Sequence, residues 1–130
     1  MKSREGLIRL KRFQVDEKRR QVAQIESMIG EFEKMARDLT DQIAAEEERS
    51  GIKDVAHFAY PTVAKAATQR RDNLAASAAG MREQLETARA ECALAVEDLA
   101  KIQALADRDH AHERGADTSH EPRTAAAYAR

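Results

Sequence analysis

The residues best suited to metal chemistry are three histidines near the C-terminus, His110, His112 and His120, in the stretch HAHERGADTSHEP. Zinc sites in proteins use three or four ligands that a folded frame holds at fixed spacing. This stretch has no hydrophobic repeat that could supply such a frame. The sequence therefore predicts no metal site.

No other grouping has the pattern of a catalytic centre. The single cysteine, Cys92, falls on an apolar repeat, where we expect it to act as a small core filler. A Gly-rich phosphate loop, a Ser/His/Asp grouping and a carboxylate pair away from solvated faces are all missing from the sequence. The chain is therefore expected not to be an enzyme and to need no cofactor.

A basic segment at the N-terminus is the first candidate binding surface. Residues 1–20 hold eight Lys or Arg and three Asp or Glu, a net charge of +5. Leu10 and Phe13 fall on the outer face of the expected helix, among arginines. Single exposed apolar residues are common, but Phe beside Arg also suits a docking surface for an acidic partner. We call the candidate contacts the N-terminal strip: Arg4, Arg9, Leu10, Arg12 and Phe13.

The stretch SGIKDVAHFAYPT, residues 50–62, holds a glycine, one of the two prolines and two of the five aromatic residues. Gly51 suits the position just after a helix end. Asp54 can cap a short turn, and Pro61 suits the first turn of a following helix. The stretch is therefore predicted to reverse the direction of the chain.

Three residues at this reversal form the second candidate binding surface. Phe58 and Tyr60 either pack under the turn or project from it as anchors. Glu47 lies at the C-terminal end of the preceding helix, where the helix dipole disfavours acidic side chains. An acidic residue at such a position mildly favours a role in binding.

Two long heptad repeats flank the reversal and predict the fold. Their apolar residues alternate at spacings of three and four, which is typical of a coiled coil. The sequence predicts an all-α, antiparallel two-helix coiled-coil hairpin over residues 1–112. We expect helix 1 at about 5–49, the turn at about 50–60, helix 2 at about 61–110, and a disordered, flexible tail at 113–130. The predicted seam consists of Ile8, Val15, Val22, Ile25, Ile29, Phe32, Leu39, Ile43, Leu74, Met81, Leu85, Cys92, Leu99 and Ile102.

The register of the hairpin follows from centring the turn on Val55. Facing residues then have numbers that sum to 110, although sums of 103 and 117 also fit the apolar rows. In this register Glu26 and Glu33 lie near Arg82 and Arg89 on one flank of the hairpin. Exposed ion pairs of this kind contribute only tenths of a kcal/mol each, so they select orientation more than they stabilise.

Two glycines inside the predicted helices, Gly30 and Gly80, also have numbers that sum to 110. Each costs about 1 kcal/mol relative to alanine in a helix. Their common level is either a coincidence or a soft point at which the backbone of a partner approaches closely. Both interpretations stay open at the level of sequence.

The sequence also indicates the cellular compartment in which the protein works. The stretch MKSREGLIRLKRF lacks the apolar core of a signal peptide. No apolar run approaches the ~20 residues that cross a bilayer. One cysteine cannot form an internal disulfide and is compatible with a reducing compartment. We therefore expect a soluble, cytoplasmic protein without direct membrane insertion.

Three stretches resemble the flagellar type III export protein FliJ family, in its alphaproteobacterial form. They are MKSREGLIRLKRFQVDEKRRQVAQIE at 1–26, GIKDVAHFAYPTVAKAATQRRDNL at 51–74, and the coil that joins and follows them. The likeness covers roughly residues 1–112, and the non-repetitive HFAYPT is its most specific part. The resemblance implies an antiparallel coiled coil without catalytic residues.

The resemblance also implies a function, as a stalk and chaperone component of the bacterial flagellar protein export apparatus. The rod would link the hexameric export ATPase to the membrane export-gate protein, at the cytoplasmic face of the inner membrane, and would also meet export chaperones. By analogy with rotary stalks, the N-terminal strip would contact the ATPase ring. Glu47, Phe58 and Tyr60 would then contact the export gate.

Two other functions remain as alternatives. A nucleic-acid-binding zipper could use RLKRFQVDEKRR as its basic region, but Asp16 and Glu17 interrupt the charge and the usual base-reading Asn is missing. We therefore expect no nucleic-acid partner. The second alternative is a generic structural coiled-coil interaction protein that forms a parallel homodimer.

Overall fold

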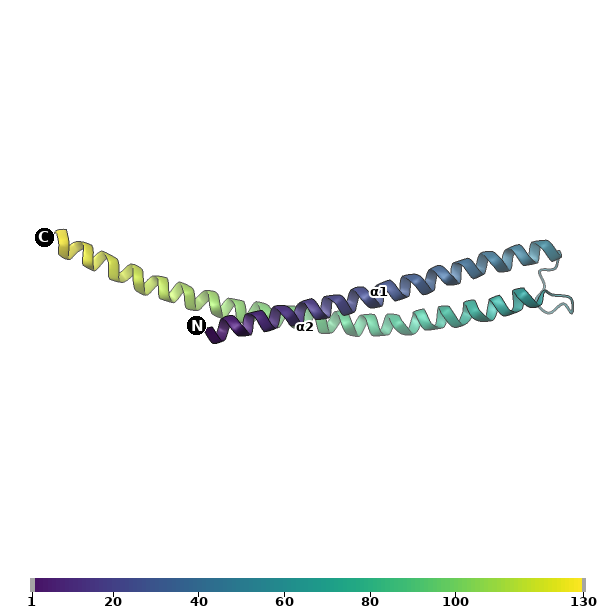
Figure 1. Ribbon diagram of the computed structural model, residues 1–130, viewed down its shortest axis with the longest axis horizontal. Coiled ribbons are helices and arrows are strands. Elements are labelled where there is room, and N and C mark those ends of the chain that lie inside the picture. Colours follow the sequence, from purple (N-terminus) through teal and green to yellow (C-terminus); the bar gives the residue numbers. More distant parts are fainter. Residues whose placement is uncertain (1, 130) are drawn as a thin grey trace. The chain divides into compact units, whose positions relative to one another are not determined.

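The structure, a computed structural model, describes the backbone of residues 2–129 and the side chains of residues 4–115. It consists of helix α1 (Lys2–Ser50), a turn segment (residues 51–61) and helix α2 (Thr62–Ala129), with no strand among the described residues. The turn segment reverses the chain so that α2 returns alongside α1 (Figure 1). The predicted all-α helical hairpin is therefore confirmed.

Helix α2 is longer than the sequence predicts, since it continues past residue 110 to Ala129. Loss of the heptad repeat removes the apolar seam, and the stretch combines helix-favouring Ala, Arg and Glu with Gly115 and Pro122, which oppose a helix. The predicted flexible tail, 113–130, falls mainly on residues 116–130. These lie outside the residues whose side chains the structure describes, so the flexibility stays a prediction.

The chain divides into two compact units, each a pair of helical segments. The turn unit, residues 19–90, contains the turn segment and the helical residues on both sides of it. Two apolar clusters form its core. One is built around Ile29, Met81 and Leu85. The other joins Leu39 and Ile43 of α1 to residues at the start of α2.

Ion pairs on the flank of the turn unit agree with the predicted register. Arg82 Nη2 lies 2.8 Å from Glu33 Oε1, and Arg89 Nη2 lies 3.9 Å from Glu26 Oε2. The prediction that these four residues lie together is confirmed. All four side chains are more than a third exposed, so solvent screens the pairs and their contribution to stability is small.

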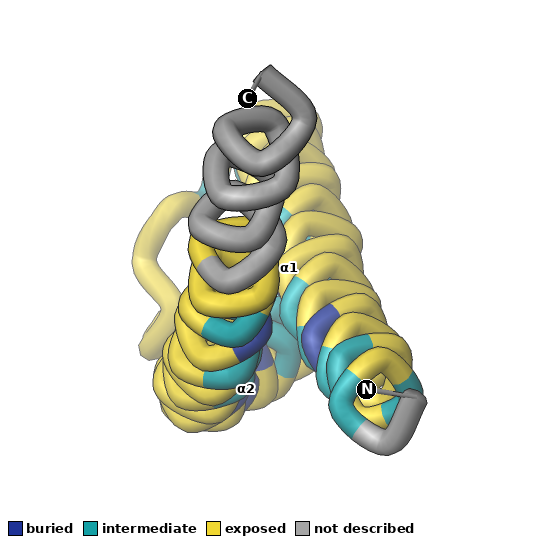
Figure 2. The backbone as a smooth tube through the Cα atoms, turned by 90° about the vertical axis from the view of Figure 1, so that its left-hand side faces the viewer, coloured by how far each residue is buried: buried dark blue, intermediate teal, exposed yellow. Residues whose placement is uncertain are grey.

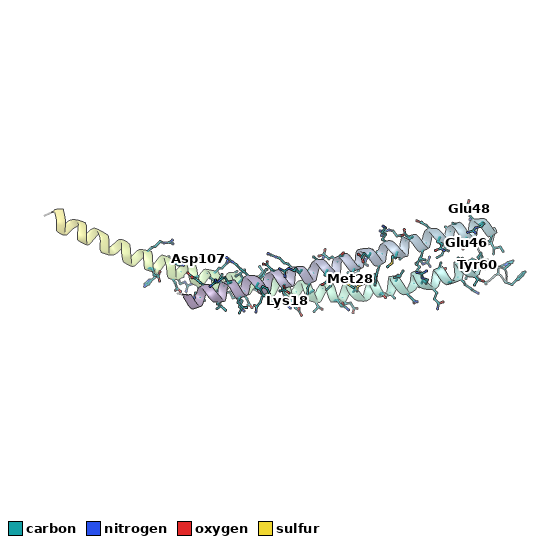
Figure 3. The ribbon with its side chains drawn as sticks, in the orientation of Figure 1. Lys18, Met28, Glu46, Glu48, Tyr60 and Asp107 are labelled. Atoms are coloured by element: carbon teal, nitrogen blue, oxygen red, sulfur yellow. The ribbon has the colours of Figure 1, made fainter. Side chains whose placement is uncertain are left out.

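The terminal unit comprises residues 1–18 and 91–130, of which the structure describes 2–18 and 91–129. Its seam is less apolar than that of the turn unit, because lysines occupy two positions of the first heptad repeat. Lys11 Nζ lies 3.8 Å from Asp98 Oδ2, and Lys18 Nζ lies 2.9 Å from Glu91 Oε2. Figure 3 labels Lys18 on α1. The aliphatic stems of these lysines cover the seam while their ammonium groups reach acidic partners.

The predicted seam lies at the contact between the helices. All fourteen of its residues are buried or half-buried, and none is exposed. Figure 2 shows the buried residues on the side of each helix that faces the other helix. Alanines share this contact: Ala64, Ala67, Ala78 and Ala88 are buried in the turn unit, and Ala106 in the terminal unit.

Replacing glycine by alanine at three positions of the turn unit should change the free energy of unfolding in opposite directions. A Cβ built on Gly30 or Gly80 meets no atom within 4 Å, so each Gly→Ala change should stabilise the helix by about 1 kcal/mol. Gly51 has φ of 73°, which L-residues adopt at a cost of about 1 kcal/mol or more. We therefore expect Gly51→Ala to lower the free energy of unfolding. Urea unfolding followed by circular dichroism checks both signs, and stabilisation by Gly51→Ala would contradict this explanation.

Candidate docking site at the turn segment

The turn segment is held by hydrogen bonds from its first residue onward. Gly51 N–H donates to Glu47 O at 2.9 Å and so ends α1 in the left-handed conformation expected after a helix. The side chain of Ser50 then accepts from Ile52 N–H at 3.1 Å. The predicted role of Gly51 is confirmed, and the chain leaves α1 in a fixed direction.

The middle of the turn segment repeats one local motif twice. Asp54 Oδ1 accepts from Ala56 N–H at 3.0 Å, as expected for a turn-capping aspartate. His57 Nδ1 accepts from Ala59 N–H, also at 3.0 Å. Backbone hydrogen bonds from His57 N–H to Asp54 O and from Tyr60 N–H to His57 O close the two turns. The segment is short and well hydrogen-bonded, so it can present a side chain in a defined direction.

Tyr60 packs under the turn. It is only 7% exposed and belongs to the core cluster of Leu39, Ile43, Ala64 and Ala67. Its hydroxyl donates to Glu47 Oε2 at 3.1 Å. In Figure 3, Tyr60 lies below the end of α1. Of the two alternatives for Tyr60, the structure therefore supports packing. As a direct contact for a partner Tyr60 is a poor candidate, because its ring is already buried.

This hydrogen bond also helps to explain why acidic side chains occur at the C-terminal end of α1. Glu47 is half-buried and accepts the hydroxyl of Tyr60, while Glu46 pairs with Arg49 one turn later. Both contacts offset the unfavourable interaction with the helix dipole. The pair of Glu46 with Arg49 has the i,i+3 spacing of helical neighbours and could have been predicted. Nothing in the spacing of Glu47 and Tyr60 predicts their contact across the turn.

The environment of Tyr60 raises its pKa above the ordinary value of a tyrosine. Burial is the largest cause, followed by the hydrogen bond to Glu47 and the negative charge of that carboxylate; Arg71 acts weakly in the opposite direction. All three raising effects favour the neutral phenol. The folded turn therefore holds the proton of Tyr60 more tightly than the unfolded chain does.

A raised pKa makes stability depend on pH in a definite direction. The contribution from Tyr60 is fully present below its unfolded-state pKa of about 10 and is lost as pH rises through the higher folded-state value. We expect the free energy of unfolding to fall as the pH rises above about 10, and Tyr60→Phe to reduce that fall. Urea unfolding at these pH values measures the difference. An equal fall in both proteins would show that Tyr60 is not responsible.

Phe58 is the most exposed large hydrophobic side chain among the described residues, at 96%. Its ring stacks on His57 with centroids 4.8 Å apart and an angle of 22° between the planes. Val55 and Val63 are also more than half exposed nearby in the chain. Of the two alternatives for Phe58, projection is the one observed. A bare aromatic ring on a hydrogen-bonded turn is the form of an anchor for an apolar pocket.

The N-terminal strip divides into one engaged residue and four exposed ones. Arg4 forms an ion pair with Asp109 and donates to Leu105 O at 3.4 Å, so its guanidinium is occupied within the terminal unit. Arg9 and Arg12 are exposed and form no ion pair with any described residue. Leu10 and Phe13 are 51% and 58% exposed. The four exposed residues retain the character of a docking surface, whereas Arg4 supports the packing of the helices.

A groove of about 520 Å³ runs along the flank of the turn unit that carries the ion pairs. Its lining residues are Glu26, Ile29, Gly30, Glu33, Arg82, Leu85, Glu86 and Arg89. Gly30 opens onto this groove, whereas Gly80 does not line it. The two glycines therefore do not form one shared notch, although Gly30 leaves space above the apolar floor.

Comparison with protein-family models, with curated proteins and with solved structures finds no match to this chain. Among the described residues, neither helix has a stretch apolar enough to span a bilayer.

Proposed function

We propose that this protein is a non-enzymatic stalk and chaperone component of the bacterial flagellar protein export apparatus, which links the export ATPase ring to the membrane export gate. The observation that carries the proposal is a helical hairpin whose turn presents Phe58, 96% exposed, on a hydrogen-bonded frame. The resemblance of residues 57–62 to the FliJ family supports the same function.

Two exposed surfaces of different chemistry fit a protein that joins two partners. The turn segment is apolar at Phe58 and Val55, and Val63 at the start of α2 is also exposed. The N-terminal strip combines two exposed arginines with two exposed apolar residues. A helical hairpin suits a linking role, because one chain carries both surfaces.

The assignment of partners follows from this chemistry. Arg9, Arg12 and Phe13 suit an acidic surface with apolar pockets, which we assign to the hexameric ATPase. Phe58 suits an apolar pocket, which we assign to the export-gate protein. Glu47 and Tyr60 support Phe58 by fixing the turn. Export chaperones are a third class of partner, and the protein would work as a peripheral protein at the cytoplasmic face of the membrane.

Charge reversal in the N-terminal strip tests the ring contact. We expect Arg9→Glu combined with Arg12→Glu to lower stimulation of the purified export ATPase at least tenfold, the loss expected for a central arginine of an interface. The matched control is Lys34→Glu with Arg37→Glu, two exposed basic residues on α1 of the turn unit. Equal stimulation by both double variants and the wild type would remove the ring contact.

The parallel homodimer makes a different prediction for the same chain. In the terminal unit Ile8 and Ile102 are both half-buried, and Lys11 and Lys18 pair with acidic residues of the returning helix. Spectroscopic labels at positions 8 and 102 of one chain, diluted with unlabelled protein, should therefore report a short distance. A long distance within one chain would favour the homodimer and remove the stalk.

A further inference from the structure

His57 is positioned to control Phe58. Its Nδ1 atom accepts a hydrogen bond from Ala59 N–H at 3.0 Å, so this nitrogen carries no proton in the observed turn. The same ring stacks on Phe58 with centroids 4.8 Å apart. One imidazole therefore supports both the backbone after Phe58 and the aromatic ring of Phe58 itself.

Adding a proton to this imidazole removes the acceptor. An imidazolium carries hydrogen on both nitrogens and can only donate. The Nδ1–H group and Ala59 N–H would then point at each other, so the ring must rotate away and its stack with Phe58 is lost. Histidine in general is the side chain that ordinarily changes charge between pH 5 and pH 8.

We propose that the neutral imidazole of His57 is a positioning group for Phe58, and that protonation of His57 releases Phe58 and weakens docking through the turn segment. This inference concerns the turn segment itself; only the identity of the docked partner, the export gate, rests on the proposed function. The partner is defined by its chemistry as a protein surface with an apolar pocket for a single aromatic ring.

None of the charged groups near His57 forms an ion pair with its imidazole in the described part of the chain. Within the turn segment these are Lys53 and Asp54, and Asp54 Oδ1 is used by Ala56 N–H. At the end of α1, Glu47 accepts the hydroxyl of Tyr60. At the start of α2 the first charged residue is Lys65. No ion pair joins His57 to any of these groups in the described part of the chain, so no nearby carboxylate compensates for the lost acceptor.

Replacing His57 by asparagine keeps a hydrogen-bond acceptor at this position but removes the group that titrates. The Oδ1 atom of asparagine can take the place of Nδ1 and accept from the N–H two residues on, as in an ordinary Asx turn, but it does not titrate. Nuclear magnetic resonance of the full chain between pH 8 and pH 5 gives the first readout. In the wild type we expect the Ala59 amide and Phe58 ring signals to move with the ring signals of His57. In His57→Asn we expect them to stay constant.

The control is His110→Asn, which removes a histidine of the terminal unit and should leave the pH response of Ala59 unchanged. The second readout is binding to the purified cytosolic part of the export-gate protein. We expect about fivefold weaker binding at pH 5 than at pH 8 for the wild type, as the loss of one hydrogen bond implies, and a smaller change for His57→Asn.

Constant Ala59 and Phe58 signals in the wild type through the titration of His57 would overturn the inference, as would a pH response in His57→Asn equal to that of the wild type. Coupled signals without gate binding at any pH would support the positioning role of His57 and reject the proposed function.

Discussion

Replacing Ile29 by alanine should lower the free energy of unfolding by about 2–4 kcal/mol, the largest effect that we expect from a single truncation in this chain. Ile29 is 6% exposed and packs with Met81 and Leu85, and Val22, Ile25 and Phe32 adjoin the same cluster. A two-helix seam has no further layer that could move in to fill the lost volume. Urea unfolding monitored by helical circular dichroism measures the change.

The matched control is the neighbouring residue, Met28, which is 43% exposed. Met28→Ala shortens a large apolar side chain on the same turn of α1 but removes it mostly from solvent. We expect a change within about 0.5 kcal/mol. If both substitutions cost the same amount, burial along the seam would not be the source of stability in the turn unit.

Replacing Phe58 by alanine should weaken binding to the export-gate protein by about 30-fold or more, while the free energy of unfolding stays within about 0.5 kcal/mol of the wild type. The ring of Phe58 is 96% exposed and leaves the core unchanged when it is removed. A projecting aromatic side chain that enters a pocket can supply much of the binding energy of an interface. Isothermal titration calorimetry with the purified gate domain measures the loss.

Phe13→Ala is the appropriate control for Phe58→Ala, because Phe13 is also an exposed ring but belongs to the N-terminal strip. It should leave gate binding unchanged and lower stimulation of the ATPase. Equal gate affinity for Phe58→Ala and the wild type would remove the turn segment as the gate contact. The hairpin itself would be unaffected by that result.

The heptad repeats predicted the hairpin only together with the chain reversal at residues 50–62, because the apolar rows alone also fit facing residues whose numbers sum to 103 or 117. Ile29 and Met81 have numbers that sum to 110 and lie in one cluster. The ion pair of Glu33 with Arg82 also lies where the register places it. Periodicity determines which face of each helix is apolar, and the position of Gly51 determines where the chain reverses.

The candidate sites could be predicted only in part. The sequence identified Phe58 and Tyr60 as notable but could not tell which would project, since that depends on the path of the backbone between Gly51 and Pro61. It also could not pair Glu47 with the hydroxyl of Tyr60. That contact lies at the turn, where the heptad repeat is interrupted, so no repeat encodes it.

The lysines that replace apolar residues in the seam of the terminal unit give the two units different responses to salt. The acidic partners of Lys11 and Lys18 are about half exposed, so salt screens these ion pairs. Ile29, Leu39 and Ile43 instead hold the turn unit together by excluding water. Separation of the helices should therefore start in the terminal unit, and concentrated salt should increase it there before it affects the turn unit. A partner that binds the terminal unit could separate its two helical segments while the turn unit stays closed.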